Sequence, residues 1–585
     1  MLTEPKMKKY NAIISFLEDF ELDFINNVIN DSSFLSNFED IDVVDEDFIN
    51  YLLIKEDNLL VWAHKYVLSI LISHYFSLTN IDENYASYFD CLSNTQNFKY
   101  LNSEKVTEKL VNFNSNDIIN ILELLQVSFL NTEVQFKNGK LSRKKSKLNF
   151  ESKGAVYTSD DITKKITTTT IKNQLDKNLN NEELRIIDFG CGTGRFYLSA
   201  FDYLVNTLNL NEHDVIYKQL YGIDIDNIAI DLLKIKAFDK LNSPSITDLK
   251  HISQNVLCKN MLVDKSNLIY EDEKAIDFDN DFINLNDKKF NVVLSNPPYF
   301  LLKINKKGKN KRLQDYYNSL KIKIKKETEY FRSSGVYDYS IEGMLNYYKL
   351  SIERMINISD DDSEIGIICP STLFGDLSSK KLRSWILLNH KLRGVEYFPE
   401  SANLFDNVSQ STVIFYLNKK SKTDKIDITL NNESFEISLD LINNIFGDNL
   451  EIAYINEIGW KILEKLSKFK KIKEYGIIRN KRGELDLSLH KNYISNLDTG
   501  WRLVRGNMIN NIDNIDENTE YVIIEDFLNH KSDEYKDNDF GKVRLTCHQI
   551  SNIDKIKRLQ FVKSKSNDIL GNSCNYIYFN EELCQ

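Results

Sequence analysis

Two short segments of the chain hold residue types and spacings that could do chemistry. The first, IIDFGCGTGRF, places three of the 20 glycines within five residues, at Gly190, Gly192 and Gly194. A turn of this kind after a strand lets the backbone approach a ligand closely, because glycine has no Cβ. The second, NVVLSNPPYF, holds two of the six prolines, Pro297 and Pro298. Both residue types are otherwise scarce, so their clusters mark candidate sites.

Two carboxylates accompany the glycine turn. Asp224 lies in the run YGIDID, 34 residues after Gly190, where a carboxylate can accept hydrogen bonds from the two hydroxyls of a ribose. Asp188 directly precedes the turn, and a negative charge there disfavours a pyrophosphate. S-adenosylmethionine, with its sulfonium, ammonium and ribose, therefore fits better than NAD. A tight strand-to-helix turn without a ligand is the alternative interpretation.

The tetrapeptide Asn296-Pro297-Pro298-Tyr299 is the most informative one in the chain. Its prolines keep the backbone extended and rigid, which can aim the Asn296 side-chain oxygen and the Pro297 carbonyl at one point. Two acceptors that converge on an amino group draw its hydrogens out of conjugation, and the freed lone pair can attack a methyl-sulfonium carbon. Tyr299 offers a ring face on which a planar base can stack. The alternative is a strand end stiffened by prolines.

The elements that must position these segments alternate between residues 154 and 420. Apolar runs predict strands at 184–190, 221–226, 290–297, 365–370, 392–398 and 411–417, and helices are predicted at 195–208, 227–240 and 341–358. This alternation predicts βαβ units and an α/β fold with a mostly parallel, Rossmann-like sheet. Ligands bind at the carboxyl ends of such strands, where both segments lie.

The two motifs, in this order, resemble those of the γ-type amino-methyltransferases, the adenine-specific DNA methyltransferases of bacterial restriction–modification systems. The resemblance covers about residues 140–420 well and 421–585 loosely. It implies a class I methyltransferase sheet, an N-terminal helical domain and a C-terminal α+β target-recognition region. It also implies an enzyme that transfers a methyl group from S-adenosylmethionine to the exocyclic amino group of a flipped-out adenine, without a metal.

The resemblance also assigns roles to individual residues. The stretch GAVYTSDDIT (154–163) is similar to the family's N-terminal cofactor motif, with Ser159 in place of the usual proline, and LCKNML is the best match to its third cofactor motif. The implied cofactor contacts are Tyr157, Thr158, Asp188, Gly190, Cys191, Gly192, Asp224, Ile225, Asn260, Met261 and Pro298. The implied catalytic residues are Asn296, Pro297 and Tyr299, and Phe405 is expected to stack on the other face of the base unless it is a core residue.

Charge is distributed unevenly along the chain, so the formal net charge of -12 says little by itself. Residues 11–60 contain thirteen Asp or Glu and one Lys, whereas 301–326 contain ten Lys or Arg and one Asp. We expect a helical N-terminal domain at 1–136, a basic linker at 137–153, a methyltransferase domain at 154–420 and a DNA-binding target-recognition region at 421–585. The basic stretches, including 461–482, are where DNA phosphates are expected.

Several alternatives stay open on the sequence. RNA or a protein glutamine amide could be the acceptor, or the chain could be a DNA-recognition subunit of a larger restriction complex. A built-in nuclease of the common type is disfavoured because no Pro-Asp dipeptide occurs. The resemblance to the family's recognition region ends early, so we expect that this region is either shortened or completed by a second polypeptide. A separate endonuclease is a further possible partner of the chain.

The same sequence favours a cytoplasmic protein. The N-terminus has neither an apolar signal region nor a cleavage site, and the seven cysteines are scattered without a CxxC pair. This pattern is typical of a reducing compartment. The most apolar segment, 59–78, includes His64, Lys65 and His74 and is predicted to be a buried helix.

Overall fold

The computed structural model forms two compact units, residues 1–460 and 461–585. The residues that the structure describes are 4–31, 34, 45–55, 58–79, 81, 84–93, 103–145, 158–266, 270–278, 280–285, 288–304, 311–402, 404, 410–471, 474, 477–511, 519–551 and 559–579.

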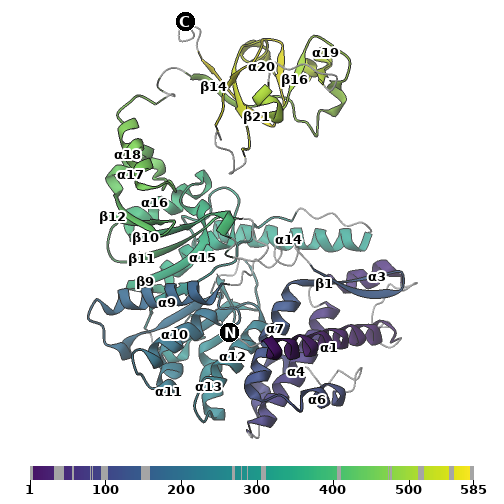
Figure 1. Cartoon of the computed structure of the whole chain (residues 1–585), viewed down its shortest axis with the longest axis vertical. Helices are drawn as coiled ribbons and strands as arrows, with labels where there is room; N and C mark the ends of the chain where they lie inside the picture. Colours follow the sequence, from purple (N-terminus) through teal and green to yellow (C-terminus); the bar gives the residue numbers. More distant parts are fainter. Residues whose placement is uncertain are drawn as a thin grey trace. The chain divides into compact units, whose positions relative to one another are not determined.

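A nine-stranded sheet organises the first unit, in the order β13-β12-β10-β11-β9-β8-β3-β4-β5 (Figure 1). Its strands are β3 (Ile186–Phe189), β4 (Leu220–Asp224), β5 (Val256–Cys258), β8 (Phe290–Ser295), β9 (Ser359–Pro370), β10 (Lys391–Phe398), β11 (Thr412–Asn418), β12 (Lys425–Leu430) and β13 (Glu433–Ser438). The five strands from β5 to β9 are parallel, whereas β11 runs antiparallel between β9 and β10. This mixed sheet matches the predicted class I methyltransferase fold.

Helices cover both faces of this sheet. They are α9 (Asp160–Leu175), α10 (Arg195–Asn206), α12 (Asn227–Asp239), α13 (Ile246–Asn255), α15 (Tyr347–Ile358) and α16 (Lys380–Asn389). From β3 through β4 to β5 the chain moves in one direction along the sheet, and right-handed crossovers place α10 and α12 on one face. From β8 through β9 to β10 it moves in the opposite direction, so the same handedness places α15 and α16 on the other face. Helix α9 packs on α10 and on β8 and β9, so it belongs to the first face.

The predicted strands and helices of this region are confirmed. The predicted helix at 341–358 begins later, at Tyr347, because the Asn346 side chain caps it by accepting a hydrogen bond from the Tyr348 backbone N–H. The sheet also continues past residue 420, where we placed the domain boundary, because β12 pairs in parallel with β10 and β13 pairs with β12.

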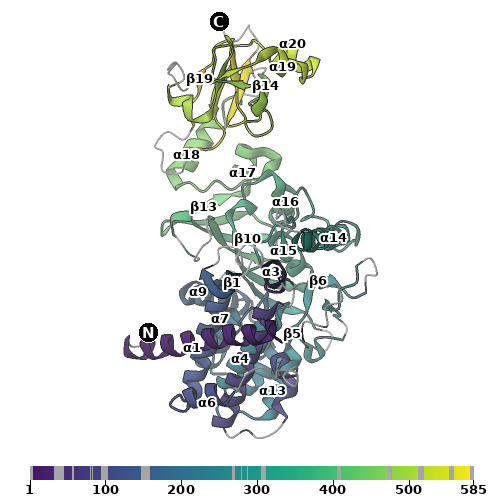
Figure 2. The ribbon, with the colours of Figure 1, turned by 90° about the vertical axis from the view of Figure 1, so that its right-hand side faces the viewer.

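The N-terminal helices form a bundle beside the sheet (Figure 2). They are α1 (Glu4–Ile29), α3 (Glu46–Leu52), α4 (Leu59–Leu78), α5 (Asp90–Ser93), α6 (Glu104–Leu110) and α7 (Ser115–Leu130). As predicted, α4 is a buried helix, and 72% of its most apolar 18-residue segment is buried inside the protein. Its His64 lies between Glu21 of α1 and Gln126 of α7, at 2.8 Å from each.

The bundle packs directly against α12 of the methyltransferase sheet through polar contacts. The buried Asp231 carboxylate accepts hydrogen bonds from the backbone N–H groups of Asp90 and Cys91, at 3.1 and 2.9 Å. The Tyr75 hydroxyl donates to the Asp239 carboxylate at 2.8 Å. The N-terminal region is therefore joined to the sheet's helices within one unit.

Part of the expected linker is a β-hairpin of β1 (Thr132–Lys137) and β2 (Lys140–Lys145). The signal was the pair Asn138-Gly139, which turns the chain with positive φ values of 52° and 75° and is typical of a two-residue hairpin turn. Arg143 of β2 pairs with the buried Glu21, so a basic residue of this segment is used inside the bundle. Residues 146–153 lie outside the described part of the chain.

The basic segment after the proline motif contributes to a long helix. Residues 311–333 form helix α14 (Lys311–Ser333), which reaches from the sheet to α3 (Figure 1). Near its start the Tyr316 hydroxyl donates to the Ile54 carbonyl at 3.3 Å. Near its end the buried Glu327 accepts a hydrogen bond from the Tyr347 hydroxyl at 2.7 Å. Four lysines remain exposed between these ends: Lys321, Lys323, Lys325 and Lys326.

The second unit contains two four-stranded sheets. One comprises β14 (Ile477–Arg482), β21 (Cys574–Phe579), β18 (Leu545–His548) and β19 (Val562–Lys563), and the other β15 (Ile494–Ser495), β17 (Tyr521–Val522), β16 (Arg502–Val504) and β20 (Asp568–Leu570). Helices α19 (Ile524–Asn529) and α20 (Asp533–Asn538) accompany them, and α18 (Glu457–Leu466) precedes them. A buried ion pair joins Arg502 to Asp568 at 2.8 Å.

We predict that Gly366→Ala destabilises the first unit by about 1–3 kcal/mol, the usual cost of overpacking. A Cβ at Gly366 would lie 2.1 Å from Thr170 Oγ1 and 2.9 Å from Ile166 Cγ2, so α9 would have to move away from β9. Equilibrium urea unfolding measures this loss. Gly375→Ala is the matched control, because a Cβ there meets no atom within 4 Å, and equal destabilisation by both variants would contradict the prediction.

Candidate cofactor and methyl-transfer site

The glycine turn joins β3 to α10 and is held against β4. The backbone N–H groups of Gly190 and Cys191 both donate to the Ile223 carbonyl, at 2.9 and 3.0 Å. Gly190, Gly192 and Gly194 have φ values of +71°, +50° and +86°, which L side chains rarely adopt. A Cβ at Gly194 would also lie 2.1 Å from Leu233, so this glycine lets α10 approach α12.

Two carboxylates lie beside this turn, as the sequence predicted. Asp188 is buried, and its Oδ2 accepts a hydrogen bond from the Tyr197 backbone N–H at 2.9 Å. Burial, with the nearby Asp224 carboxylate adding to it, raises the pKa of Asp188 to about 8. Asp224 accepts from Gly192 N at 2.8 Å and from Asp226 N at 2.9 Å, and burial raises its pKa as well.

These residues fit a cofactor that carries a ribose and a positive charge. The other oxygen of Asp188, Oδ1, is buried and has no hydrogen-bond partner among the described residues, so a cationic donor would satisfy it. A Cβ at Gly190 or Gly192 would meet no atom within 4 Å, which leaves open space in front of the turn. Each Asp224 oxygen has one backbone N–H donor and can still accept from a ribose hydroxyl. The cofactor groups of S-adenosylmethionine match this donor and acceptor set.

The third predicted cofactor segment follows β5. Asn260 begins β6 (Asn260–Asp264), and its Nδ2 donates to Asp272 at 2.7 Å. Met261 is buried. The backbone of this segment reaches the Asp224 strand end, because Lys259 N donates to the Asp224 carbonyl at 2.9 Å. Ile225 is 54% exposed at the same end and is available to contact an adenine ring. The predicted segments thus meet at one edge of the sheet.

The proline motif leaves β8 next to the glycine turn. The Ser295 hydroxyl donates to the Phe189 carbonyl at 2.6 Å and so ties the end of β8 to the end of β3. Asn296 Nδ2 donates to the Thr158 hydroxyl at 2.9 Å. Thr158 is buried, so the structure brings together two residues that lie 138 positions apart in the sequence and that were both predicted to belong to the site.

The aromatic residue of the motif is fixed from two sides. The Tyr299 hydroxyl donates to the Ile368 carbonyl of β9 at 3.3 Å, and its ring lies edge-on to Tyr348 with centroids 6.4 Å apart. Burial raises the pKa of the Tyr299 hydroxyl, so it stays protonated. The Phe300 ring stacks on Tyr347 at 5.6 Å. The motif is therefore anchored to β9 and α15.

Two predicted residues, Tyr157 and Phe405, lie outside the described part of the chain, so their roles stay predictions. Cys191 is buried, and burial raises the pKa of its thiol well above the ordinary value, which favours a packing role. Sequence reasoning missed Arg195, whose Nη1 donates to the Thr158 carbonyl at 2.7 Å. It also missed Lys236, whose Nζ donates to the Thr193 carbonyl at 3.0 Å. The position of Arg195 directly after the glycine turn was the available signal; nothing local marked Lys236.

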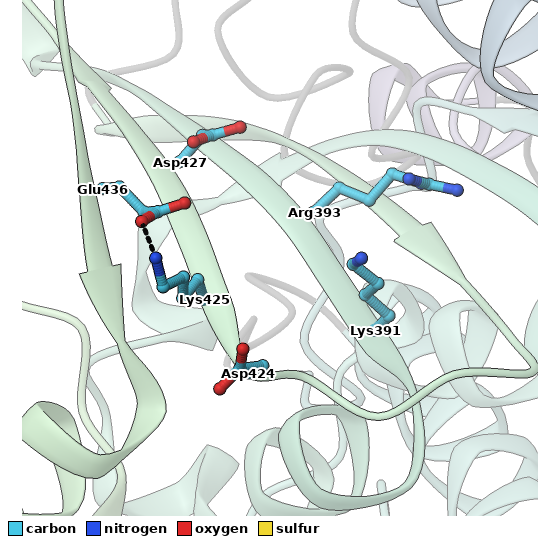
Figure 3. A pocket seen from close by; sticks show the side chains of 6 residues that line it. All are labelled: Lys391, Arg393, Asp424, Lys425, Asp427 and Glu436. Atoms are coloured by element: carbon cyan, nitrogen blue, oxygen red, sulfur yellow. Dashed lines mark ion pairs between the residues drawn. The ribbon is translucent and has the colours of Figure 1, made fainter.

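A hollow of about 240 Å³ lies elsewhere, on β10, β12 and β13 (Figure 3). Its lining residues are Lys391, Arg393, Asp424, Lys425, Asp427 and Glu436. Lys425 pairs with Glu436 at 2.6 Å, and Arg393 pairs with Glu364 at 2.7 Å. Because β11 and β9 separate β10 from β8, this hollow is not part of the candidate site at the proline motif.

The sheet, with the glycine turn and the proline motif at one edge, has the class I methyltransferase fold. Residues 218–405, about a third of the chain, match the sequence model of the Eco57I restriction-modification methylase family. The matched segment includes Asp224, Asn260 and the whole proline motif.

Two relatives extend the comparison. The Escherichia coli type II restriction enzyme and methyltransferase RM.Eco57I is 25% identical over an alignment of 438 residues, and the match covers 68% of this chain and 41% of that protein. The structure of a DrdV–DNA complex superposes with a TM-score of 0.52 at 12% identity, and the match covers 85% of this chain and 52% of that one. The chain thus spans about half the length of these relatives.

We predict that S-adenosylmethionine binds more tightly as the pH rises from 6 to about 8. Below its pKa of about 8 the Asp188 carboxyl is neutral and must lose a proton to hold a cation, which costs up to about tenfold in affinity per pH unit. Calorimetric titration measures the slope. Asp188→Asn should bind weakly and without this slope, whereas Asp239→Asn, which changes a half-buried carboxylate of the bundle interface, should keep it. A wild-type affinity that is constant over this range would contradict the prediction.

Proposed function

We propose that this protein is a site-specific DNA methyltransferase that methylates the exocyclic amino group of a flipped-out adenine, as the modification component of a restriction–modification system. One observation carries the proposal: Asn296-Pro297-Pro298-Tyr299 leaves β8 beside the Gly190–Gly194 turn of β3, and Asn296 contacts Thr158. The Eco57I-family match over the same motif supports it. S-adenosylmethionine supplies the methyl group when bound.

The proposed chemistry follows from the acceptors at the motif. The adenine amino group is a poor nucleophile because its lone pair is conjugated with the ring. Asn296 presents its amide with Nδ2 bound to Thr158, and its Oδ1 is shielded from water. This oxygen and the Pro297 carbonyl accept the two amino hydrogens and leave the nitrogen lone pair free to react. The methylated amine is cationic and releases one proton to solvent, so no separate base is required.

Base flipping costs a few kcal/mol of unstacking, which stacking inside the protein must offset. The anchored Tyr299 ring provides one face of the proposed base pocket. We assign the other face to Phe405, as the family resemblance implies. Aromatic stacking contributes about 1–3 kcal/mol per base, which is of the size needed.

Double-stranded DNA is the proposed partner. The exposed lysines of α14 and the basic residues of 461–482 supply phosphate contacts, and residues 461–585 form the proposed target-recognition region. The DrdV relative is itself described in complex with DNA. A separate endonuclease or specificity subunit is a further proposed partner. We place the activity in the cytoplasm, in keeping with the free cysteines among the described residues.

We predict that Asn296→Ala lowers DNA methylation by about 10²–10³-fold, the usual effect of removing a hydrogen-bond partner at a reacting centre. Its affinity for S-adenosylmethionine should change less than about threefold, because Asn296 holds the base. Sequencing of modified adenines in genomic DNA measures methylation. Asn284→Ala, whose amide contacts Asn255 away from the motif, is the control. Equal methylation by wild type and Asn296→Ala would refute the mechanism.

The acceptor itself is tested by offering DNA, RNA and protein with radioactive S-adenosylmethionine. We expect incorporation into DNA at adenine. Incorporation into RNA or a glutamine amide instead would replace the proposed acceptor. Methylation of one defined DNA site by the purified chain alone would show that no second polypeptide is needed.

A further inference from the structure

Glu123 lies on α7 of the N-terminal bundle, outside every motif of the methyltransferase sheet. Its Oε1 faces two cations from helices of that sheet, Arg195 Nη2 at 3.4 Å and Lys236 Nζ at 3.6 Å. One carboxylate oxygen of the bundle is thus shared by two cationic side chains of the sheet's helices.

Each of these cations also holds the backbone of a cofactor segment. Arg195 Nη1 donates to the Thr158 carbonyl at 2.7 Å, and Thr158 accepts the hydrogen bond from the Asn296 amide. Lys236 Nζ donates to the carbonyl of Thr193, which lies inside the glycine turn, at 3.0 Å. The two cations therefore connect Glu123 to both segments that surround the proposed cofactor position.

The electrostatics make Glu123 the main counter-charge. The Arg195 side chain is 19% exposed and the Lys236 side chain 8%. Burial lowers the pKa of both groups, Glu123 opposes this, and the Arg195 charge lowers the pKa of Lys236 further. Asp160 also pairs with Arg195, at 2.6 Å, but its side chain is 93% exposed and its charge is screened by solvent. The Glu123 side chain is 29% exposed, so it is the less screened of the two carboxylates, and its loss would leave two buried like charges without their main counter-charge.

We propose that Glu123 is a positioning residue of the methyl-transfer site, which fixes the Thr158 and Thr193 backbones through Arg195 and Lys236. The proposal rests on the function proposed above. In this proposal, a residue of the acidic N-terminal bundle helps to position the cofactor-binding segments. Without Glu123, the two cations repel each other and the carbonyls that they hold are free to move.

A role in docking the bundle alone would have different consequences. The Tyr75–Asp239 hydrogen bond crosses the same interface between the bundle and α12, and neither of its partners contacts a cofactor segment through a described hydrogen bond. Tyr75→Phe therefore removes an interface contact of similar type and serves as the matched control for Glu123→Gln.

The test is calorimetric binding of S-adenosylmethionine to the full chain, with thermal unfolding measured for each variant. We expect Glu123→Gln to weaken binding about tenfold at pH 7 and Tyr75→Phe less than about twofold at a comparable loss of Tm. The loss of S-adenosylmethionine affinity in Glu123→Gln relative to wild type should grow toward pH 9, because the pKa of Lys236 falls without its carboxylate. A role in docking alone predicts that the ratio of the wild-type affinity to the Glu123→Gln affinity does not change with pH.

A double-mutant cycle guards against a folding defect. Lys236→Met removes the other end of the same contact, so adding it to Glu123→Gln should weaken binding less than the product of the two single effects. If the two substitutions weaken binding independently, so that their effects multiply, the positioning role is overturned. It is also overturned if Glu123→Gln binds S-adenosylmethionine as tightly as Tyr75→Phe does. Both outcomes leave the proposed function intact. A wild-type chain that binds no S-adenosylmethionine would overturn the proposed function itself, and this inference with it.

Discussion

The parallel pairing of β3 with β8 is the constraint on which the site depends. Asp188 of β3 is in register with Leu294 of β8, so the glycine turn and the proline motif leave the sheet at the same edge. The buried hydrogen bond from Ser295 to the Phe189 carbonyl locks the two strand ends together. Since both strands are fully buried, a shift in their register would move apolar side chains out of the core. The core therefore fixes the relative position of the two motifs.

Helix α9 extends this constraint to a third segment. It packs on β8 and β9 at the point where Gly366 leaves room for Thr170, and Thr158 lies just before its first turn. Close packing of this helix thus sets where the Thr158 hydroxyl meets the Asn296 amide. The packing of Thr170 at Gly366, about three helical turns along α9 from Thr158, therefore helps to orient a functional side chain.

Ion pairs and hydrogen bonds of largely buried charged side chains join the N-terminal bundle and α14 to the helices of the sheet. The bundle contributes Glu123 to Arg195 and Lys236, and α14 contacts both α3 and the Tyr347 helix. Buried cations need nearby carboxylates, so these contacts also set which surfaces can pack together. The N-terminal region consequently belongs to the same compact unit as the sheet.

The sequence by itself determined the strands and helices of the sheet, the glycine turn with Asp188 and Asp224, and the proline motif, because these are set by local apolar runs and by backbone demands on glycine and proline. It also held an Asn-Gly hairpin signal within the expected linker. Only the tertiary structure decided the contacts of Asn296 with Thr158, of Arg195 with Thr158, and of Glu123 with Lys236. These pairs lie far apart in the chain, and whether two polar side chains meet depends on how the helices pack, which no local pattern encodes.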